Sequence, residues 1–192
     1  IDARRECFTP DIHVNSVILD GGKAPNIIPD YSKIRMEFRT SSMSRLEKVD
    51  EMIKKCANAA AMALDCTVTL TFGLSDFADM VRNYPLENKI TELMAGYGLK
   101  VGDVPPASGS SDVGNISYRC PAMQSMLSIT DENFALHTRD FRDATLKPQA
   151  HDAMAKGACC LADLSLKIFN DDSFRNTVYE AWQKELKNKQ SD

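Results

Sequence analysis

The hydrophobic pattern between His13 and Leu64 changes its period from two to about 3.6, and this change constrains the fold more than any other feature of the chain. Residues 13–19 are rich in β-branched and apolar side chains and run into Gly21-Gly22, where glycine permits the positive φ angles of a turn. Residues 31–40 then alternate between apolar and charged side chains. The apolar positions are Ile34, Met36 and Phe38. The pattern predicts two strands, the second of them half exposed in an antiparallel sheet.

A helix and a third strand are predicted next. Ser44 followed by Glu47 has the spacing of a capping box, and apolar residues recur at helical intervals as far as Leu64. Residues 66–72 alternate again and predict a strand. Strand, strand, helix, strand is most of a β-α-β-β-α-β unit that lacks its first strand and most of its first helix. Residues 1–6 are expected to be the end of that helix.

The pattern breaks over residues 73–83, which we interpret as a hinge between domains covering residues 1–73 and 74–192. Beyond it we predict a helix through Leu86, Ile90 and Met94 that ends at Gly96 or Gly98. The remaining predicted elements are a loop over 104–111, a short buried strand over 123–129, a long helix starting at Pro148, and a last helix capped by Asp172 or Ser173 and running through Trp182.

Composition excludes some classes of function. The chain has 192 residues, 43% of them hydrophobic, and a net charge of −4. An acidic balance argues against a nucleic-acid partner, and no apolar run is long enough to span a membrane. None of the six cysteines forms a C-x-x-C pair, so we expect reduced thiols and a cytoplasmic location.

Four ordered segments carry a family resemblance. They are Gly21-Gly22-Lys23-Ala24-Pro25-Asn26-Ile27-Ile28-Pro29-Asp30, then Phe38-Arg39, then Gly109-Ser110-Ser111-Asp112-Val113-Gly114-Asn115, then Leu136-His137-Thr138. Together they resemble the M20 family of metal-dependent amidohydrolases and peptidases, in particular the aminoacylase-1-like-2 and aminobenzoyl-glutamate hydrolase branch.

The resemblance implies an α/β fold. Residues 1–73 are similar to the later part of an α+β lid, or dimerisation, domain. Residues 74–192 are similar to the C-terminal portion of a mixed-sheet α/β catalytic domain of the zinc-hydrolase type. In the family the H-x-D motif, the bridging aspartate, the Glu-Glu pair and a further acidic ligand all precede the lid. The given sequence contains no H-x-D and no Glu-Glu pair, so four of the five expected ligands are missing from it.

His137 matches the family's last metal ligand, and the resemblance implies that it binds one of two zinc ions. Thr138 or Asp140 would then orient its ring. The alternative is a capping or core histidine that binds no metal. Of the other two histidines, His13 is expected to be structural and His151 to be a core histidine on the apolar face of a helix.

Asn26 and Arg39 match lid residues that, in related enzymes, reach across the dimer interface to the substrate's carboxylate or amide. An arginine fork suits a carboxylate, and an asparagine amide can donate to an oxyanion. The alternatives are a left-handed turn residue for Asn26 and a solvated strand charge for Arg39. The loop Gly109, Ser110 and Ser111, oriented by Asp112, could hold the carboxylate of the substrate. An ordinary Gly-Ser turn is the competing interpretation.

Two hypotheses of function follow. The first is part of a di-zinc amidohydrolase or peptidase that hydrolyses an amide or peptide bond next to a carboxylate and forms a homodimer through the lid. The second is a non-catalytic binding or dimerisation fragment. On either hypothesis the 192-residue chain alone is expected to be inactive and to hold little zinc, because metal affinity depends on the number of ligands.

Overall fold

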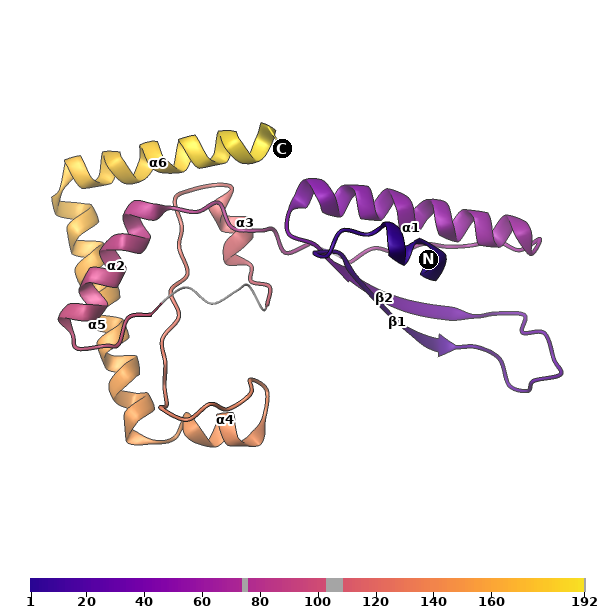
Figure 1. The fold of residues 1–192 in the computed structure, drawn as a ribbon, viewed down its shortest axis with the longest axis horizontal. Helices are drawn as coiled ribbons and strands as arrows, with labels where there is room; N and C mark the ends of the chain where they lie inside the picture. The colour runs from indigo at the N-terminus through magenta and orange to yellow at the C-terminus, as the bar shows by residue number, and fades with distance from the viewer. Residues whose placement is uncertain (74–75, 103–108, 192) are drawn as a thin grey trace. The chain divides into compact units, whose positions relative to one another are not determined.

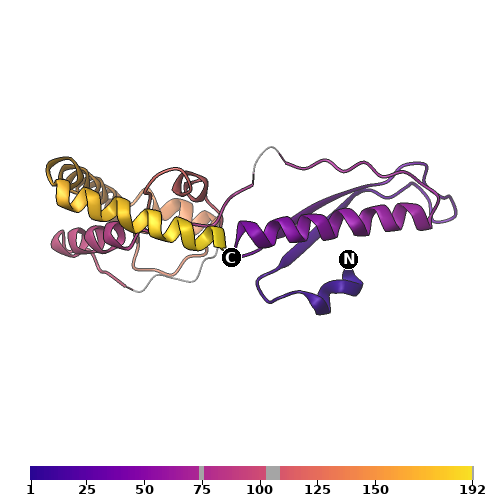
Figure 2. The ribbon, with the colours of Figure 1, turned by 90° about the horizontal axis from the view of Figure 1, so that it is seen from above.

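The computed structural model describes residues 1–73, 76–102 and 109–191, and it is mixed α/β with a two-stranded sheet and several helices. Figures 1 and 2 show its elements from two directions. The chain divides into two compact units, Ile1–Asp79 and Met80–Asp192. Each unit is described by itself below.

Unit 1 is built on an antiparallel hairpin. A 3-10 helix, η1 (Asp2–Cys7), precedes β1 (His13–Asp20), which pairs with β2 (Lys33–Arg39) in the register His13 to Arg39 and Ile18 to Ile34. The loop between the strands turns at Gly22, where φ is +98° and a Cβ would come within 3.1 Å of Pro29. The predicted strands and glycine turn are therefore confirmed.

Helix α1 (Met43–Ala63) follows β2 and lies along one face of the hairpin (Figure 1). The predicted helix is confirmed, but the predicted cap at Ser44 is wrong. The N-cap is Ser42, whose hydroxyl accepts a hydrogen bond from the Arg45 backbone N–H at 3.4 Å. Ser42 has extended backbone angles, which an N-cap requires, whereas Ser44 is already helical. The carboxylate of Asp79 accepts from the Met43 N–H and so satisfies another donor of the first turn.

The core of unit 1 lies between this helix and the sheet. Val14 from β1 packs against Val49 and Ile53 of α1, and all three side chains are at most 5% exposed. Partly buried apolar residues surround them: Ile1, Phe8, Ile12, Met36, Phe38 and Met52. Because η1 supplies Ile1 and its C-cap Phe8, the N-terminal segment covers the same face of the sheet as α1.

The third strand predicted for unit 1 does not form. Residues 66–72 are not hydrogen-bonded in the sheet, which contains only β1 and β2 among the described residues. The segment instead stays close to α1, where the ammonium of Lys54 lies 5.2 Å from the centre of the Phe72 ring. Alternation of apolar residues can predict a side-chain pattern, but a strand also needs a neighbouring backbone to pair with.

All regular elements of unit 2 are helices over its described residues. Its elements are α2 (Tyr84–Gly96), α3 (Val113–Ser117), α4 (Arg139–Ala144), α5 (Pro148–Asn170) and α6 (Asp172–Ser191). The first predicted helix is confirmed with its end at Gly96, and Gly98 follows at φ +73°. The long helix begins at Pro148 as predicted, since proline fits the first helical turn. The predicted loop over 104–111 lies largely outside the described residues.

The core of unit 2 joins α2, α5 and α6 (Figure 2). Leu86 and Ile90 of α2 meet Cys160 and Leu164 of α5, and Val178 of α6 completes the cluster. Burial raises the pKa of the Cys160 thiol, because the charged thiolate is poorly solvated there.

A buried polar network fixes the start of α2 and the position of α3. The amide of Asn83 donates to the Val178 carbonyl at 2.9 Å and accepts from the Leu86 N–H at 3.2 Å. The hydroxyl of Ser117 accepts from the Val81 N–H at 2.9 Å. The indole of Trp182 donates to the Ser117 carbonyl at 2.7 Å. Asn83 and Ser117 are fully buried, so both depend on these partners.

Three further predictions for unit 2 are wrong. Residues 123–129 form no strand. The Leu127 side chain instead packs against α5 at Gly157, where a Cβ on residue 157 would come within 3.0 Å of the leucine Cδ2. The last helix is capped by Asp171 and not by Asp172 or Ser173, since the carboxylate of Asp171 accepts a hydrogen bond from the Phe174 N–H. His151 is exposed rather than in the core, because the buried face of α5 runs through Ala150 and Ala153.

No helix within the described ranges has the length and apolar character needed to cross a membrane.

Candidate functional site

The two faces of the hairpin differ in character. Val14 and Phe38 are paired neighbours that face α1. On the opposite face Val17 pairs with Arg35, and two further pairs are wholly polar or charged, namely His13 with Arg39 and Asn15 with Glu37. All four of these side chains are exposed. Since residues directly opposite in an antiparallel pair point to the same side, this face presents a strip of polar groups.

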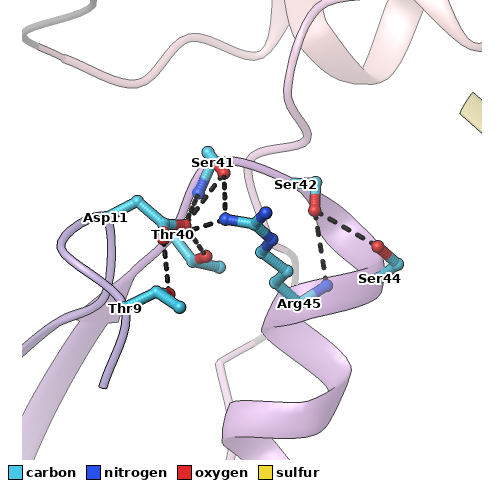
Figure 3. Close-up of polar contacts among 7 residues, drawn as sticks. All are labelled: Thr9, Asp11, Thr40, Ser41, Ser42, Ser44 and Arg45. Carbon is cyan, nitrogen blue, oxygen red and sulfur yellow. Dashed lines mark hydrogen bonds and ion pairs between the residues drawn. The ribbon is translucent and has the colours of Figure 1, made fainter. Parts of the chain in front are cut away.

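A carboxylate holds the two strands together at the end of the hairpin that carries His13 and Arg39. Asp11 lies just before β1 and accepts from the hydroxyls of Thr9 at 2.6 Å and Thr40 at 2.8 Å (Figure 3). It also accepts from the N–H and hydroxyl of Ser41, at 3.2 and 2.9 Å. The guanidinium of Arg45 completes the cluster with an ion pair of 2.9 Å. We call these five residues the Asp11 cluster.

The same donors determine the charge state of Asp11. The Thr9 hydroxyl and then those from Thr40 and Ser41 hold its pKa well below the ordinary value, because each stabilises the ionised carboxylate. This cluster was not predicted from the sequence. Its signal was a Thr-Pro-Asp turn before a strand and a run of three hydroxyl residues after the next strand.

We expect Asp11→Asn to lower the stability of unit 1 at pH 7 and to remove part of its acid sensitivity. A carboxylate whose pKa is lowered in the folded state stabilises the fold at pH values above its pKa in the unfolded chain, which is about 3.9. That contribution to stability is lost as the pH falls toward the pKa that Asp11 has in the folded state. Thermal melts by circular dichroism should therefore separate wild type from variant most at pH 7, and the separation should shrink progressively as the pH falls below about 4.

Asp30→Asn, in the exposed hairpin loop, is the matched control and should leave both curves unchanged. An Asp11→Asn deficit that persists undiminished at low pH would show that the carboxylate charge is not what stabilises the cluster.

Asn26 and Arg39 lie at opposite ends of the hairpin. Asn26 is exposed in the loop, in a turn closed by a hydrogen bond from the Ile27 N–H to the Ala24 carbonyl at 3.2 Å. It does not have the positive φ of a left-handed residue. Arg39 ends β2, and its Nε donates to Glu37 at 2.6 Å. Six residue steps of strand separate Arg39 from the loop, about 20 Å. One copy of the chain therefore does not bring the two side chains together.

The predicted carboxylate loop leads into the short helix α3. Gly109 and Ser110 are exposed, and the hydroxyl of Ser111 accepts from the Val113 N–H at 3.3 Å. Asp112 precedes the helix without capping it through its side chain. The Ser117 network described above anchors the other end of this helix to Trp182. The loop is thus held at its helical end by buried hydrogen bonds.

His137 is exposed and has a φ of +65°, a left-handed conformation that is uncommon outside glycine. It is followed by Thr138, the N-cap of α4, whose hydroxyl accepts from the Phe141 N–H at 3.3 Å and donates to the Ala135 carbonyl at 2.7 Å. The cap fixes the turn, so the histidine is presented on the surface next to a helix start. Strained residues of this kind are concentrated at functional sites.

A two-zinc centre does not fit the residues that the structure describes. Over residues 1–73, 76–102 and 109–191, no three His, Cys, Asp or Glu side chains come together in an arrangement able to hold a metal ion. A zinc site needs three or four protein ligands, and His137 supplies one. We therefore assign no catalytic step through a metal to these residues.

Comparison with known proteins finds a family match in unit 1 and similarity to two dipeptidases along nearly the whole chain. Residues 2–64, which include η1, β1, β2 and α1, match the M20 peptidase dimerisation domain. The chain is 28% identical over 190 residues to the Xaa-Arg dipeptidase of Homo sapiens, an alignment that covers 97% of this chain and 43% of that protein. It is 29% identical over 187 residues to the Xaa-Arg dipeptidase of Mus musculus, covering 95% and 42% respectively.

The chain thus spans less than half the length of these relatives. Asn26, Arg39 and the Asp11 cluster all lie within the dimerisation-domain match, whereas Gly109 to Asp112 and His137 lie beyond it. The roles predicted for these residues stay predictions.

Proposed function

We propose that the chain contributes the dimerisation domain and the C-terminal part of the catalytic domain to a metal-dependent peptidase or amidohydrolase. The observation that carries this proposal is the dimerisation-domain match over residues 2–64, combined with similarity to two dipeptidases along nearly the whole chain. The bond hydrolysed would be an amide or peptide bond next to a carboxylate, as in a dipeptide ending in arginine.

In this proposal Arg39 binds the substrate's carboxylate, Asn26 donates to its amide, and the loop from Gly109 to Asp112 holds its charged end. Asn26 and Arg39 are far apart in one copy, so they would serve one substrate only if a second subunit supplied one of them. His137 would bind zinc together with further ligands that the described residues do not supply.

A chimera tests the activity. The stretch of the human dipeptidase that aligns with this chain is replaced by all 192 residues, and cleavage of Xaa-Arg dipeptides is measured. We expect cleavage, and a loss of at least about 100-fold on His137→Ala, since changes to residues that merely support a ligand cost 10- to 100-fold. His151→Ala, another exposed histidine, should have little effect.

A second chimera contains only residues 80–192 of this chain and keeps the human dimerisation domain. It provides an independent test if the first chimera does not fold. A folded chimera that is inactive, or one whose activity is indifferent to His137→Ala, would overturn the proposal. For the isolated chain we expect far less than one zinc per molecule, because one imidazole holds zinc weakly. Stoichiometric zinc that is lost on His137→Ala would show that further ligands are present.

The proposed dimer forms through unit 1. Exposed apolar side chains are numerous in the outer half of the hairpin: Ile18 68%, Ile27 62%, Ile28 93%, Tyr31 59% and Ile34 58%. Each strand of the two-stranded sheet also has one edge that pairs with no other described strand. Exposed apolar groups beside an open strand edge are suited to association with a second copy.

Analytical ultracentrifugation should find twice the mass of 21.3 kDa at micromolar concentrations. Ile18→Asp should weaken the dimer by about tenfold or more, because a charge would be buried at the interface. Leu146→Asp, at an apolar residue of unit 2 that is 74% exposed against 68% for Ile18, is the control and should leave the dimer intact. A chain that stays monomeric at high concentration would contradict the proposal.

The second candidate function is a non-catalytic dimerisation module. It is favoured by the lack of any cluster of three potential ligands within the described ranges. Dimerisation without cleavage by either chimera would select it.

A further inference from the structure

His13 lies directly opposite Arg39 on the face of the sheet that points away from α1. The register pairs these two residues, and the adjacent pair, Val14 with Phe38, points into the core. Directly opposed residues have Cβ atoms about 4.5–5.5 Å apart. Both side chains are exposed, and within the described chain α1 and η1 pack on the other face. The pair is therefore accessible to a small ligand.

Two basic side chains in this position repel each other when the imidazole is protonated, and like charges directly opposite destabilise a strand pair. Glu37 offsets part of this through its bond to the Arg39 Nε at 2.6 Å. That bond uses only one side of the guanidinium, so the two terminal nitrogens can still form a fork with a carboxylate.

The other charges near His13 are few. Arg5 of η1 donates to the Val14 carbonyl at 3.1 Å and is paired with Asp2 at 2.8 Å, so it brings no unbalanced charge to the pair. From β2 the facing groups are Arg39 directly opposite and Glu37 diagonally. When the imidazole is protonated, His13, Arg39 and Glu37 together carry a net charge of +1. A single carboxylate neutralises this charge.

We propose that His13 and Arg39 together form a carboxylate-binding site whose affinity rises as the pH falls, with His13 as a second recognition group beside Arg39. This inference rests on the proposed function, in which Arg39 binds the substrate's carboxylate. The ligand class is a small molecule with a free carboxylate next to an amide. Histidine suits the pH dependence because its charge changes between about pH 5 and 8.

Asp11 acts as a positioning residue for this site. It lies two residues before His13 and accepts from Thr40 and Ser41, which directly follow Arg39. Figure 3 shows the Asp11 cluster tying the segment before β1 to the residues that follow β2. This tie would set the spacing of the two basic side chains. The hydrogen bonds and the ion pair of Asp11 go to Thr9, Thr40, Ser41 and Arg45, so its effect on binding would be indirect.

The test titrates the full 192-residue chain with N-acetylalanine and, as the neutral match, N-acetylalaninamide, followed by two-dimensional NMR at constant ionic strength. We expect the acid to shift signals of His13 and Arg39 and the amide to leave them unmoved. The dissociation constant for the acid should be lower at pH 5.5 than at pH 8 by up to about fivefold, the range of one exposed charge interaction.

The variants divide the roles. His13→Gln should still bind the acid with an affinity that no longer depends on pH. Arg39→Gln should abolish binding, and Arg39→Lys should weaken it because the fork is lost while the charge remains. Asp11→Asn should weaken binding but keep its dependence on pH. Signal dispersion in each spectrum establishes that the variant is folded, and His151→Gln, an exposed histidine of unit 2, is the control for a general effect of removing a histidine.

Equal binding of acid and amide, or a pH dependence that survives His13→Gln, would overturn the inference. The proposed function is judged separately by the chimera. An active chimera that responds to Arg39→Gln and not to His13→Gln at any pH would refute the role of His13 and leave the proposed function standing.

Discussion

Asn83→Ala is expected to lower the free energy of unfolding of unit 2 by about 2–4 kcal/mol. The amide is fully buried and bridges two elements, since it caps α2 through the Leu86 N–H and donates to the Val178 carbonyl of α6. Losing an N-cap costs about 1 kcal/mol, and loss of a buried hydrogen bond costs about 1–3 kcal/mol. Urea unfolding followed by tryptophan fluorescence measures unit 2 alone, because Trp182 is the one tryptophan in the sequence.

Asn170→Ala, at the exposed end of α5, is the matched control and should change the stability by no more than about 0.5 kcal/mol. If the urea concentration at the midpoint of unfolding were the same for both variants and the wild type, the hydrogen bonds of Asn83 would have no part in stabilising the helices.

Ile53→Ala is expected to cost unit 1 about 3 kcal/mol, and thereby most of its stability. The side chain is 5% exposed and packs with Val14 and Val49 in the only cluster of buried apolar residues found for unit 1 in the described chain. Removing a buried isoleucine costs 2–5 kcal/mol, and a small domain has few kcal/mol to lose. Hydrogen exchange of the β1 amides, measured by mass spectrometry, should become fast in the variant.

Ile28→Ala makes the same chemical change at a side chain that is 93% exposed, and it should leave the exchange of β1 unaltered in the monomer. Trp182 fluorescence should show unit 2 still folded in Ile53→Ala. Simultaneous loss of both units would contradict their separation into Ile1–Asp79 and Met80–Asp192.

Much of the fold could be predicted because it rests on local pattern. The hairpin, its glycine turn and the helices α1, α2 and α5 follow from periods of two or 3.6, from Gly22 and from Pro148. The errors share one cause. Residues 66–72 and 123–129 have the side-chain pattern of strands, but their state depends on a partner backbone that the pattern does not specify. His151 was misplaced because its helix carries apolar residues on more than one face.

The candidate site was predictable in its residues and not in its arrangement. The ordered motifs marked Asn26, Arg39 and His137 through family resemblance, but no local rule reveals that Asn26 and Arg39 end up at opposite ends of one hairpin. The Asp11 cluster was missed because its members are separated by about 30 residues in sequence, with Asp11 reaching Ser41. Contacts of that kind are set by strand register, which turn geometry and burial decide together.

The sequence by itself determined the antiparallel hairpin, the long helix that follows it and the resemblance to M20 peptidases, because periodicity and ordered motifs are local properties of the chain. Tertiary structure alone decided which strands found partners, that Asn83 and Ser117 became buried bridges, and that His13 came to face Arg39. Those outcomes depend on hydrogen bonds and packing contacts between segments that are distant in sequence. Each contact requires both segments to be in the right position, which neither segment specifies by itself.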